Sequence, residues 1–240
     1  HAPSSVCPPS RYALLTGRYC WRTPLKSSVL WPWDPPLIEQ DQLTVPGLLQ
    51  QNGYQTACIG KWHLGWEWAT IDGASADSGT EIGKYDESTR LALEKNIDYG
   101  KPMRGGPVDC GFDTYFGVDV PNFPPYTWFE QDRIANEPTE DKPTDMFGHP
   151  GRMKPDWKLE EMVPEFVQRP VNYIEESGSD PFFLYLPLTS PHTPIVPNEA
   201  FLGTSGAGPY GDFVCEVDWV VGEVMTALEK RGIAEDTLLI

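Results

Sequence analysis

The chain is poor in basic residues. Its 240 residues hold 18 Lys and Arg against 35 Asp and Glu, which gives a formal net charge of −17 at pH 7 and a pI of about 4.5. Nucleic acids and anionic membranes are bound by basic protein surfaces. This balance therefore argues against a nucleic-acid partner and against a membrane-surface partner.

Long hydrophobic runs and the usual start of a chain are also missing. No stretch of 18 or more apolar residues occurs, so the sequence predicts no transmembrane helix. The chain begins at His1, has no signal-peptide pattern, and ends at Thr237–Ile240, which resembles a buried strand interrupted in mid-course. We therefore expect a chain truncated at both ends, with any signal region outside it.

Five cysteines are present, but their spacing excludes two common structural uses. No C-x-x-C pair or Cys/His zinc spacing occurs, which argues against structural zinc and against a disulfide scaffold. Cys58 and Cys215 lie in apolar contexts and are predicted to be buried free thiols. No asparagine begins an N-x-Ser/Thr site, which favours a bacterial protein exported to the periplasm or the cell exterior.

The residues that are present predict one globular α/β domain. Hydrophobic residues make up 40% of the chain and aromatic residues 12%, enough for a substantial core. A short helix at Val45–Asn52 is predicted to feed a strand at Tyr54–Ile59. The apolar run Pro181–Pro187 predicts a strand buried on both faces of a parallel sheet.

Two longer helices are predicted in the second half, at residues 158–177 and 211–231. The second has a broad apolar face, Gly232 as its C-cap, and Glu216, Asp218 and Glu223 as solvated acids. Residues 66–157 are rich in Gly, Pro, Asp and Trp and predict irregular insertion or substrate-binding loops of the same domain. The whole of 1–240 is thus interpreted as part of a single domain.

The sequence C-P-P-S-R at Cys7–Arg11, followed by L-T-G-R at Leu15–Arg18, is the most informative motif. Prolines suit the first turn of a helix, and Ser10–Tyr19 predicts that helix with a glycine stop signal. A reactive group at residue 7 would face the positive helix end, where anions are stabilised. The motif resembles the maturation signature of the type I sulfatases, in which the cysteine is oxidised to formylglycine.

A second block, G-Y-Q-T at Gly53–Thr56 and G-K-W-H-L-G at Gly60–Gly65, makes the case independently. If the glycine turn stays extended, Lys61 and His63 project to the same side, where an ammonium and an imidazole suit a tetrahedral oxyanion. Alone, the pair would indicate a solvated lysine beside a hydrogen-bonded histidine. The block resembles the family's second signature, G-Y-x-T-x-x-x-G-K-x-H-x-G, and two signatures in order favour the family.

A third element places His192 in the sequence S-P-H-T-P, directly after the strand predicted at Pro181–Pro187. Ligands of open α/β folds gather beyond the carboxyl ends of strands, so His192 lies where an active-site residue is expected. By itself, a loop histidine between prolines is more often a surface residue. The family resembled here has a histidine in a P-H-x-P setting at this point.

The resemblance implies an alkaline-phosphatase-like three-layer α/β/α sandwich with a mostly parallel sheet, of which this chain is the central part. It implies hydrolysis of a sulfate monoester by the hydrate of formylglycine, with a covalent sulfo-enzyme that splits one hard step into two. Arg11 would steady the formylglycine, and Lys61 and His192 would hold the sulfate or the leaving oxygen. His63 would orient or deprotonate the hydrate.

The same resemblance implies calcium, held by an Asp-Asp pair before this chain and an Asp-Asn pair after it. Within the chain, only Cys7, as formylglycine, would be a metal ligand. The implied partners are a sulfated carbohydrate or aryl sulfate and the enzyme that generates formylglycine. The negative charge slightly favours a small or sparsely sulfated ester. A phosphatase or phosphodiesterase of the alkaline-phosphatase-like superfamily and a non-catalytic glycan-binding relative stay open as alternatives.

Overall fold

Strand β1, Gln55–Lys61, lies in the middle of the main sheet of this computed structural model, which describes residues 2–76, 79 and 81–240. It pairs in parallel with β2, Thr114–Val118, on one side and with β7, Phe182–Tyr185, on the other. Two short antiparallel strands complete the order β4-β3-β2-β1-β7, namely β3 at Phe129–Glu130 and β4 at Arg133–Ile134. The predicted mostly parallel sheet is confirmed.

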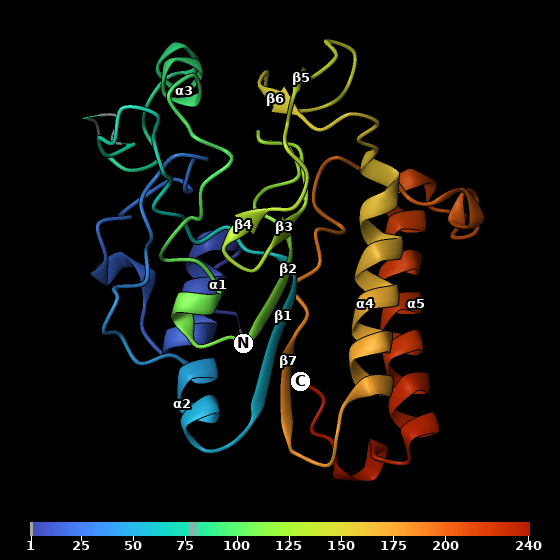
Figure 1. Cartoon of the computed structure of the whole chain (residues 1–240). Helices are drawn as coiled ribbons and strands as arrows, with labels where there is room; N and C mark the ends of the chain where they lie inside the picture. The colour runs from blue at the N-terminus through green and yellow to red at the C-terminus, as the bar shows by residue number, and fades with distance from the viewer. Residues whose placement is uncertain (1, 77–78, 80) are drawn as a thin grey trace.

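Helices cover both faces of this sheet. Helices α1 and α2, at Cys7–Thr16 and Val45–Gln51, lie on one side, and α4 and α5, at Met162–Glu176 and Gly208–Arg231, lie on the other (Figure 1). Helix α2 begins at a capping hydroxyl, since Thr44 Oγ1 accepts from the amide of Gly47 at 3.1 Å. The arrangement is the expected three-layer α/β/α sandwich.

The predicted helices are present with shifted boundaries. Helix α1 begins three residues before the predicted Ser10, and Gly17 follows it in a left-handed conformation with φ +66°. The helix predicted at 158–177 is a 3-10 turn at Leu159–Glu161 followed by α4, and the helix predicted at 211–231 begins at Gly208. The residue after α5, Gly232, is its C-cap as predicted.

Residues 66–157 are irregular over much of their length but supply β2, β3 and β4 to the main sheet. They also contain helix α3, Glu87–Glu94, and a two-stranded sheet of β5, Glu140–Asp141, and β6, Arg152–Met153. In Figure 1, α3 and the β5–β6 pair lie beyond the end of the sheet at which β1 finishes. The remaining short turns are 3-10 helices at Cys20–Arg22, Val108–Cys110, Glu199–Phe201 and Ala234–Asp236.

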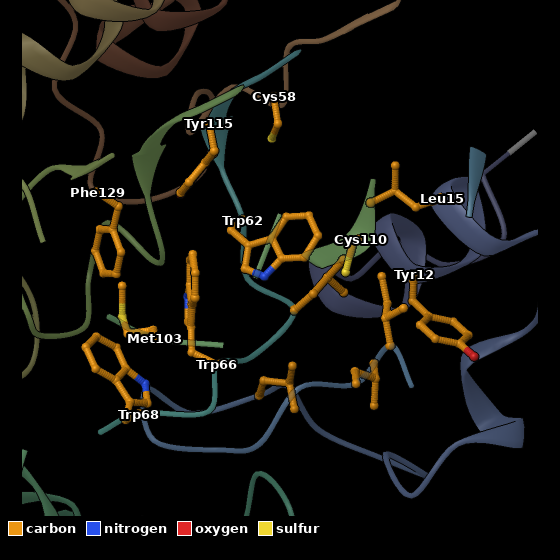
Figure 2. Packing of buried hydrophobic residues seen from close by; sticks show 14 of the residues in the cluster. Tyr12, Leu15, Cys58, Trp62, Trp66, Trp68, Met103, Cys110, Tyr115 and Phe129 are labelled. Atoms are coloured by element: carbon orange, nitrogen blue, oxygen red, sulfur yellow. The ribbon is translucent and has the colours of Figure 1, made fainter. Parts of the chain in front are cut away.

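An aromatic core supports the segment that leaves β1 (Figure 2). Trp66 stacks on Phe129 with ring centroids 5.4 Å apart and packs at 5.9 Å against Tyr115 of β2. Trp62 and Trp68 are buried beside it. The residues after Lys61 are therefore fixed by large rigid side chains, which matters for the site described below.

Several predictions about exposure are wrong. Strand β7 is half-buried rather than buried on both faces, because β1 is its only partner within the described part of the chain. The segment Thr237–Ile240 forms no strand, and its Leu238 is 84% exposed. Glu216 is fully buried rather than solvated, because the segment around Asn198 packs over that face of α5 and donates a backbone hydrogen bond to its carboxylate at 3.1 Å.

The apolar face of α5 is also divided. Phe213, Val220 and Val224 are buried, whereas Val214, Val221 and Met225 are exposed. Cys58 is buried with a free thiol as predicted, while Cys215 is only half-buried. Within the described residues, no helix is long and apolar enough to cross a membrane.

Candidate active site

A pocket of about 400 Å³ opens where β1, β2 and β7 end and α1 begins. Three of the residues singled out from the sequence line it, namely Cys7, His63 and His192. The remaining lining comes from α1 and the segment before it, from the loop after β2 and from Val29. These further residues are Ser4, Ser5, Val6, Ser10, Val29, Val120, Asn122 and Phe123.

Cys7 is the first residue of α1, and its side chain is partly buried. Pro8 and Pro9 occupy the first-turn positions that need no amide donor. The first turn contains no acidic residue, so the positive end of the helix is not compensated by a side chain there. Residue 7 therefore lies where a negatively charged group is favoured.

Arg11 joins α1 to the ends of two strands. Its Nη1 donates to the carbonyl oxygen of Lys61 at 2.7 Å, and its Nη2 donates to that of Leu188 at 3.4 Å. Its Nε is buried and has no hydrogen-bond partner among the described residues. The guanidinium is thus held in place by backbone oxygens of β1 and of the segment after β7.

Lys61 ends β1 and is only 1% exposed. Burial lowers the pKa of its ammonium to about 8, an effect partly opposed by the nearby side chain of Cys7 and by the carboxylate of Asp119. The side chains of Lys61 and Cys7, which belong to different signatures, therefore interact at this end of the sheet.

His63 is buried beside Lys61, but not in the extended turn that the spacing suggested. Its φ is +54°, in the left-handed region. Burial, reinforced by the charge of Lys61, lowers the pKa of its imidazole well below 6.5, so the ring is neutral at pH 7. Since Nε2 lies 3.0 Å from the carbonyl oxygen of Leu30, the proton is assigned to Nε2. Nδ1, which is buried without a partner among the described residues, is then a free acceptor.

His192 also lines the pocket, in the turn after β7, and is exposed. Its Nδ1 is 2.6 Å from the carbonyl oxygen of Thr193, which makes Nδ1 the protonated nitrogen and leaves Nε2 as an acceptor. Burial of part of the ring, together with the charges of Lys61 and Arg11, lowers its pKa. The two preceding hydroxyls, those of Thr189 and Ser190, are buried without a described partner.

Asp119 is a buried acid at this end of the sheet that the sequence prediction missed. It directly follows β2 and is 7% exposed. Its Oδ1 accepts from the backbone amide of His63 at 3.1 Å and from Trp66 Nε1 at 3.2 Å. Burial raises the pKa of this carboxyl to about 6. The sequence feature that could have identified Asp119 is its position, since an acid directly after an apolar strand lies at the carboxyl end of a parallel sheet.

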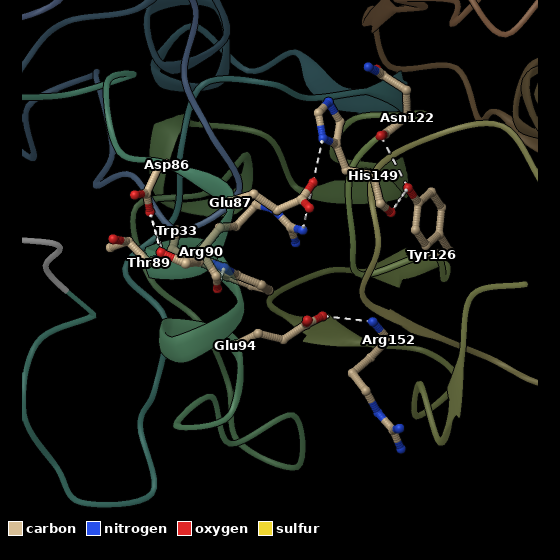
Figure 3. Close-up of polar contacts among 11 residues, drawn as sticks. Trp33, Asp86, Glu87, Thr89, Arg90, Glu94, Asn122, Tyr126, His149 and Arg152 are labelled. Atoms are coloured by element: carbon tan, nitrogen blue, oxygen red, sulfur yellow. Dashed lines mark hydrogen bonds and ion pairs between the residues drawn. The ribbon is translucent and has the colours of Figure 1, made fainter. Parts of the chain in front are cut away.

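The outer wall of the pocket is tied to α3 and to the β5–β6 pair (Figure 3). Phe123 stacks face to face on His149, with ring centroids 4.3 Å apart. The carbonyl oxygen of Asn122 accepts from the amide of His149 at 2.9 Å and from the hydroxyl of Tyr126 at 3.1 Å. Nδ1 of His149 lies 3.5 Å from Glu87 of α3. These contacts hold the wall in one position.

The described side chains do not by themselves form a calcium site. Among residues 2–76, 79 and 81–240, no group of three or more His, Cys, Asp or Glu is placed to hold a metal ion. Calcium takes 6–8 oxygen ligands. The one carboxylate described beside Lys61, that of Asp119, already accepts two hydrogen bonds.

Comparison with known proteins places this geometry in context. A sulfatase family profile matches residues 1–240. The chain is 27% identical over 264 residues to an N-acetylgalactosamine-6-O-sulfatase of Bacteroides thetaiotaomicron, covering 100% of this chain and 49% of the relative. It is 30% identical over 252 residues to human arylsulfatase A, covering 100% of this chain and 42% of the relative.

The fold is also found in a solved structure. A Bacteroides thetaiotaomicron sulfatase from work on the metabolism of multiple glycosaminoglycans superposes with a TM-score of 0.72 at 23% identity, covering 95% of this chain and 50% of that one. The shared architecture is the alkaline-phosphatase-like sandwich. The chain spans about half the length, or less, of the relatives it matches. Because the family profile covers it from residue 1 to residue 240, the chain belongs to the sulfatase family.

Proposed function

We propose that this chain carries the reacting half of a site that hydrolyses sulfate monoesters, with Cys7 converted to formylglycine as the nucleophile. The observation that carries the proposal is the meeting of both sequence signatures at one pocket. Cys7, His63 and His192 line it, and the side chain of Lys61 interacts electrostatically with that of Cys7. Membership of the sulfatase family supports the same reaction.

The residues of this chain would have two kinds of role, stabilisation of negative charge and proton transfer. The hydrated aldehyde at residue 7 would supply a hydroxyl for attack on sulfur. Lys61, with its buried ammonium, and Arg11, with its fixed guanidinium, would offset negative charge that develops on the sulfuryl oxygens. Preorganised charges of this kind cost no rearrangement at the moment of reaction.

The two histidines suit proton transfer at different atoms. His63 is neutral, and its free Nδ1 can accept a proton from a hydroxyl on residue 7. His192, whose Nδ1 is occupied by the Thr193 carbonyl oxygen, lines the same pocket, and its Nε2 would contact the ester oxygen or the sulfate. The pocket residues beyond these groups, Val29, Val120, Asn122 and Phe123, would then meet the alcohol part of the ester.

The proposal includes a calcium ion, most of whose ligands would come from segments outside this chain. The family resemblance assigns its carboxylate and amide ligands to segments before and after the chain, and the described residues would add only the oxygen at residue 7. We therefore expect the 240-residue chain alone to be inactive, because one oxygen cannot replace a cage of 6–8. Turnover by the purified chain with added calcium would contradict this expectation.

A sulfated carbohydrate is the substrate class that we favour over a simple aryl sulfate. The Bacteroides relative is named for a sulfated amino sugar, and a wall with an aromatic ring, aliphatic side chains and one amide suits a sugar ring. The proposal includes a formylglycine-generating maturation enzyme as a partner, and export to the periplasm or the cell exterior. Fractionation of cells that express the full-length protein tests the export.

The central test joins chemistry at residue 7 with turnover. The full-length protein should be co-expressed with a maturation enzyme and assayed on p-nitrophenyl sulfate and on sulfated monosaccharides. Mass spectrometry of the tryptic peptide that contains residue 7 should show a loss of roughly 18 Da relative to cysteine. An active enzyme with a fully unmodified peptide would refute formylglycine. Hydrolysis of phosphate esters alone would favour a phosphatase, and glycan binding without turnover would favour a non-catalytic relative.

A further inference from the structure

Asp119 connects β2 and the buried indole of Trp66 to the turn that carries His63. The residue lies directly after β2, and its Oδ1 accepts from the amide of His63 and from the indole of Trp66. Trp66 is 1% exposed and is packed between Tyr115 and Phe129. One oxygen atom therefore joins the aromatic core to the backbone of a pocket residue.

The backbone of His63 needs such an anchor. Its φ of +54° lies in the left-handed region, which residues other than glycine adopt uncommonly. The neighbouring bonds in this segment do not replace it, since the amide of Trp62 donates to Val118 and that of Trp66 to Asp34. Asp119 is the described acceptor of the His63 amide.

We propose that Asp119 is a positioning residue, which holds the left-handed backbone of His63 so that its imidazole stays in the catalytic pocket. The ring is then fixed at two points, by Asp119 through the backbone and by the Leu30 carbonyl oxygen through Nε2. Its Nδ1 keeps its place among the pocket residues. The effect on turnover rests on the function proposed above, but the effect on geometry does not.

The chain contains a matched control at the other end of the same strands. Asp113 directly precedes β2, and its Oδ2 accepts from the amide of Thr56 at 2.8 Å and from the Thr56 hydroxyl at 3.0 Å. Like Asp119, it is an aspartate beside β2 that accepts a backbone hydrogen bond from the β1 segment. Unlike Asp119, it lies at the amino end of both strands, away from the pocket.

The test compares Asp119→Ala, Asp119→Asn and Asp113→Ala in the full-length protein with equal formylglycine content. Because a misplacement of about 1 Å can cost on the order of 100-fold, Asp119→Ala should lower kcat by about 10- to 100-fold with little change in KM. Asp119→Asn keeps the Oδ1 acceptor and should stay within about 3-fold of wild-type kcat. Asp113→Ala should lower Tm and leave kcat unchanged.

Two results would overturn the proposal: a folded Asp119→Ala protein with wild-type kcat, or an Asp119→Asn protein as impaired as Asp119→Ala. Should Asp119→Ala fail to fold, Trp66→Phe removes one of the two donors while keeping an aromatic ring. It should lower kcat at unchanged KM, and wild-type kcat in that variant would count against the role. A crystal structure of Asp119→Asn should keep His63 at positive φ, and loss of that geometry would refute the hydrogen-bond role even if the wild-type protein hydrolyses no sulfate ester.

Discussion

The two ends of β1 differ in how fully their polar groups are paired, and only the carboxyl end borders the pocket. At the amino end, Asp113 accepts both hydrogen bonds from Thr56 and a third, at 2.6 Å, from the side chain of Gln50. At the carboxyl end, Lys61 and His63 are buried. There, His63 Nδ1 and Arg11 Nε have no partner among the described residues.

The pKa values of the two aspartates that flank β2, Asp113 and Asp119, are shifted in opposite directions. Burial works against ionisation of Asp113, but hydrogen bonds from Gln50 and Thr56 prevail and lower its pKa below 3.8. Burial dominates at Asp119 and raises its pKa to about 6. Unpaired buried polar groups cost stability, so the carboxyl end keeps an arrangement that folding alone would not favour. Such sites are typical of function.

The largest predicted effect tests whether the carboxyl end is the reactive end at all. Cys7→Ala in the full-length protein removes the atom that would become the nucleophile, and turnover of p-nitrophenyl sulfate should fall by at least about 1,000-fold. Cys215→Ala is the matched control, because this thiol on α5 is also partly buried but does not line the pocket. Equal activity of the two variants would remove residue 7 from the mechanism.

The next effect compares two buried lysines. Lys61→Ala removes an ammonium beside residue 7 and should reduce kcat by about 100-fold, and His192→Ala should act similarly, with little change in Tm. Lys142 is 9% exposed, and its ammonium donates to the carbonyl oxygens of Pro143 and Met146. Lys142→Ala should therefore lower Tm without changing kcat. Wild-type rates for Lys61→Ala or His192→Ala would exclude that residue from the site.

A smaller effect, on stability alone, is expected at the amino end. Since hydrogen bonds to its carboxylate lower the pKa of Asp113, its stabilisation is present above the unfolded value near 3.8 and is lost as pH falls through the folded value. Asp113→Ala should cost about 0.5–1.5 kcal/mol at pH 7. Urea unfolding at pH 7 and at pH 3 measures the cost, and a cost that does not shrink in acid would contradict this account.

Sequence patterns predicted the parts of this fold that depend on local signals. Prolines after Cys7 and the glycine after Thr16 marked α1, and the apolar residues after Tyr54 marked β1. Asp119 escaped notice because nothing in its neighbourhood shows that an amide 56 residues earlier approaches it. The left-handed turn at His63 likewise has no signal in the residue type, and its amide is bonded by Asp119, which is distant in sequence.

Exposure on α5 was the least predictable feature, because helical spacing shows which residues share a face but not what covers it. Val214 and Val221 belong to the apolar face and are exposed, whereas Glu216 is covered by the segment at Asn198. In the sequence, Glu216 has the pattern of a solvated acid on the exposed face of a helix. Only the tertiary contact between α5 and that segment distinguishes it.

The smallest predicted effect concerns Glu216, a buried acid that does not line the pocket. Its Oε1 is buried without a described partner, and burial raises its pKa. Glu216→Gln keeps an acceptor for the Asn198 amide and removes a buried charge, so Tm at pH 7 should rise by about 1–3 °C. Because the folded pKa is raised, the cost of the charge is present above the unfolded pKa near 4.5, and the advantage of Gln should vanish below it.

Scanning calorimetry at pH 7 and pH 4 measures both Tm differences, with kcat expected to stay at the wild-type level. A clear loss of kcat would show that residues of α5 also affect the reaction. The difference in function between the two ends of β1 would then not be confined to the strand ends.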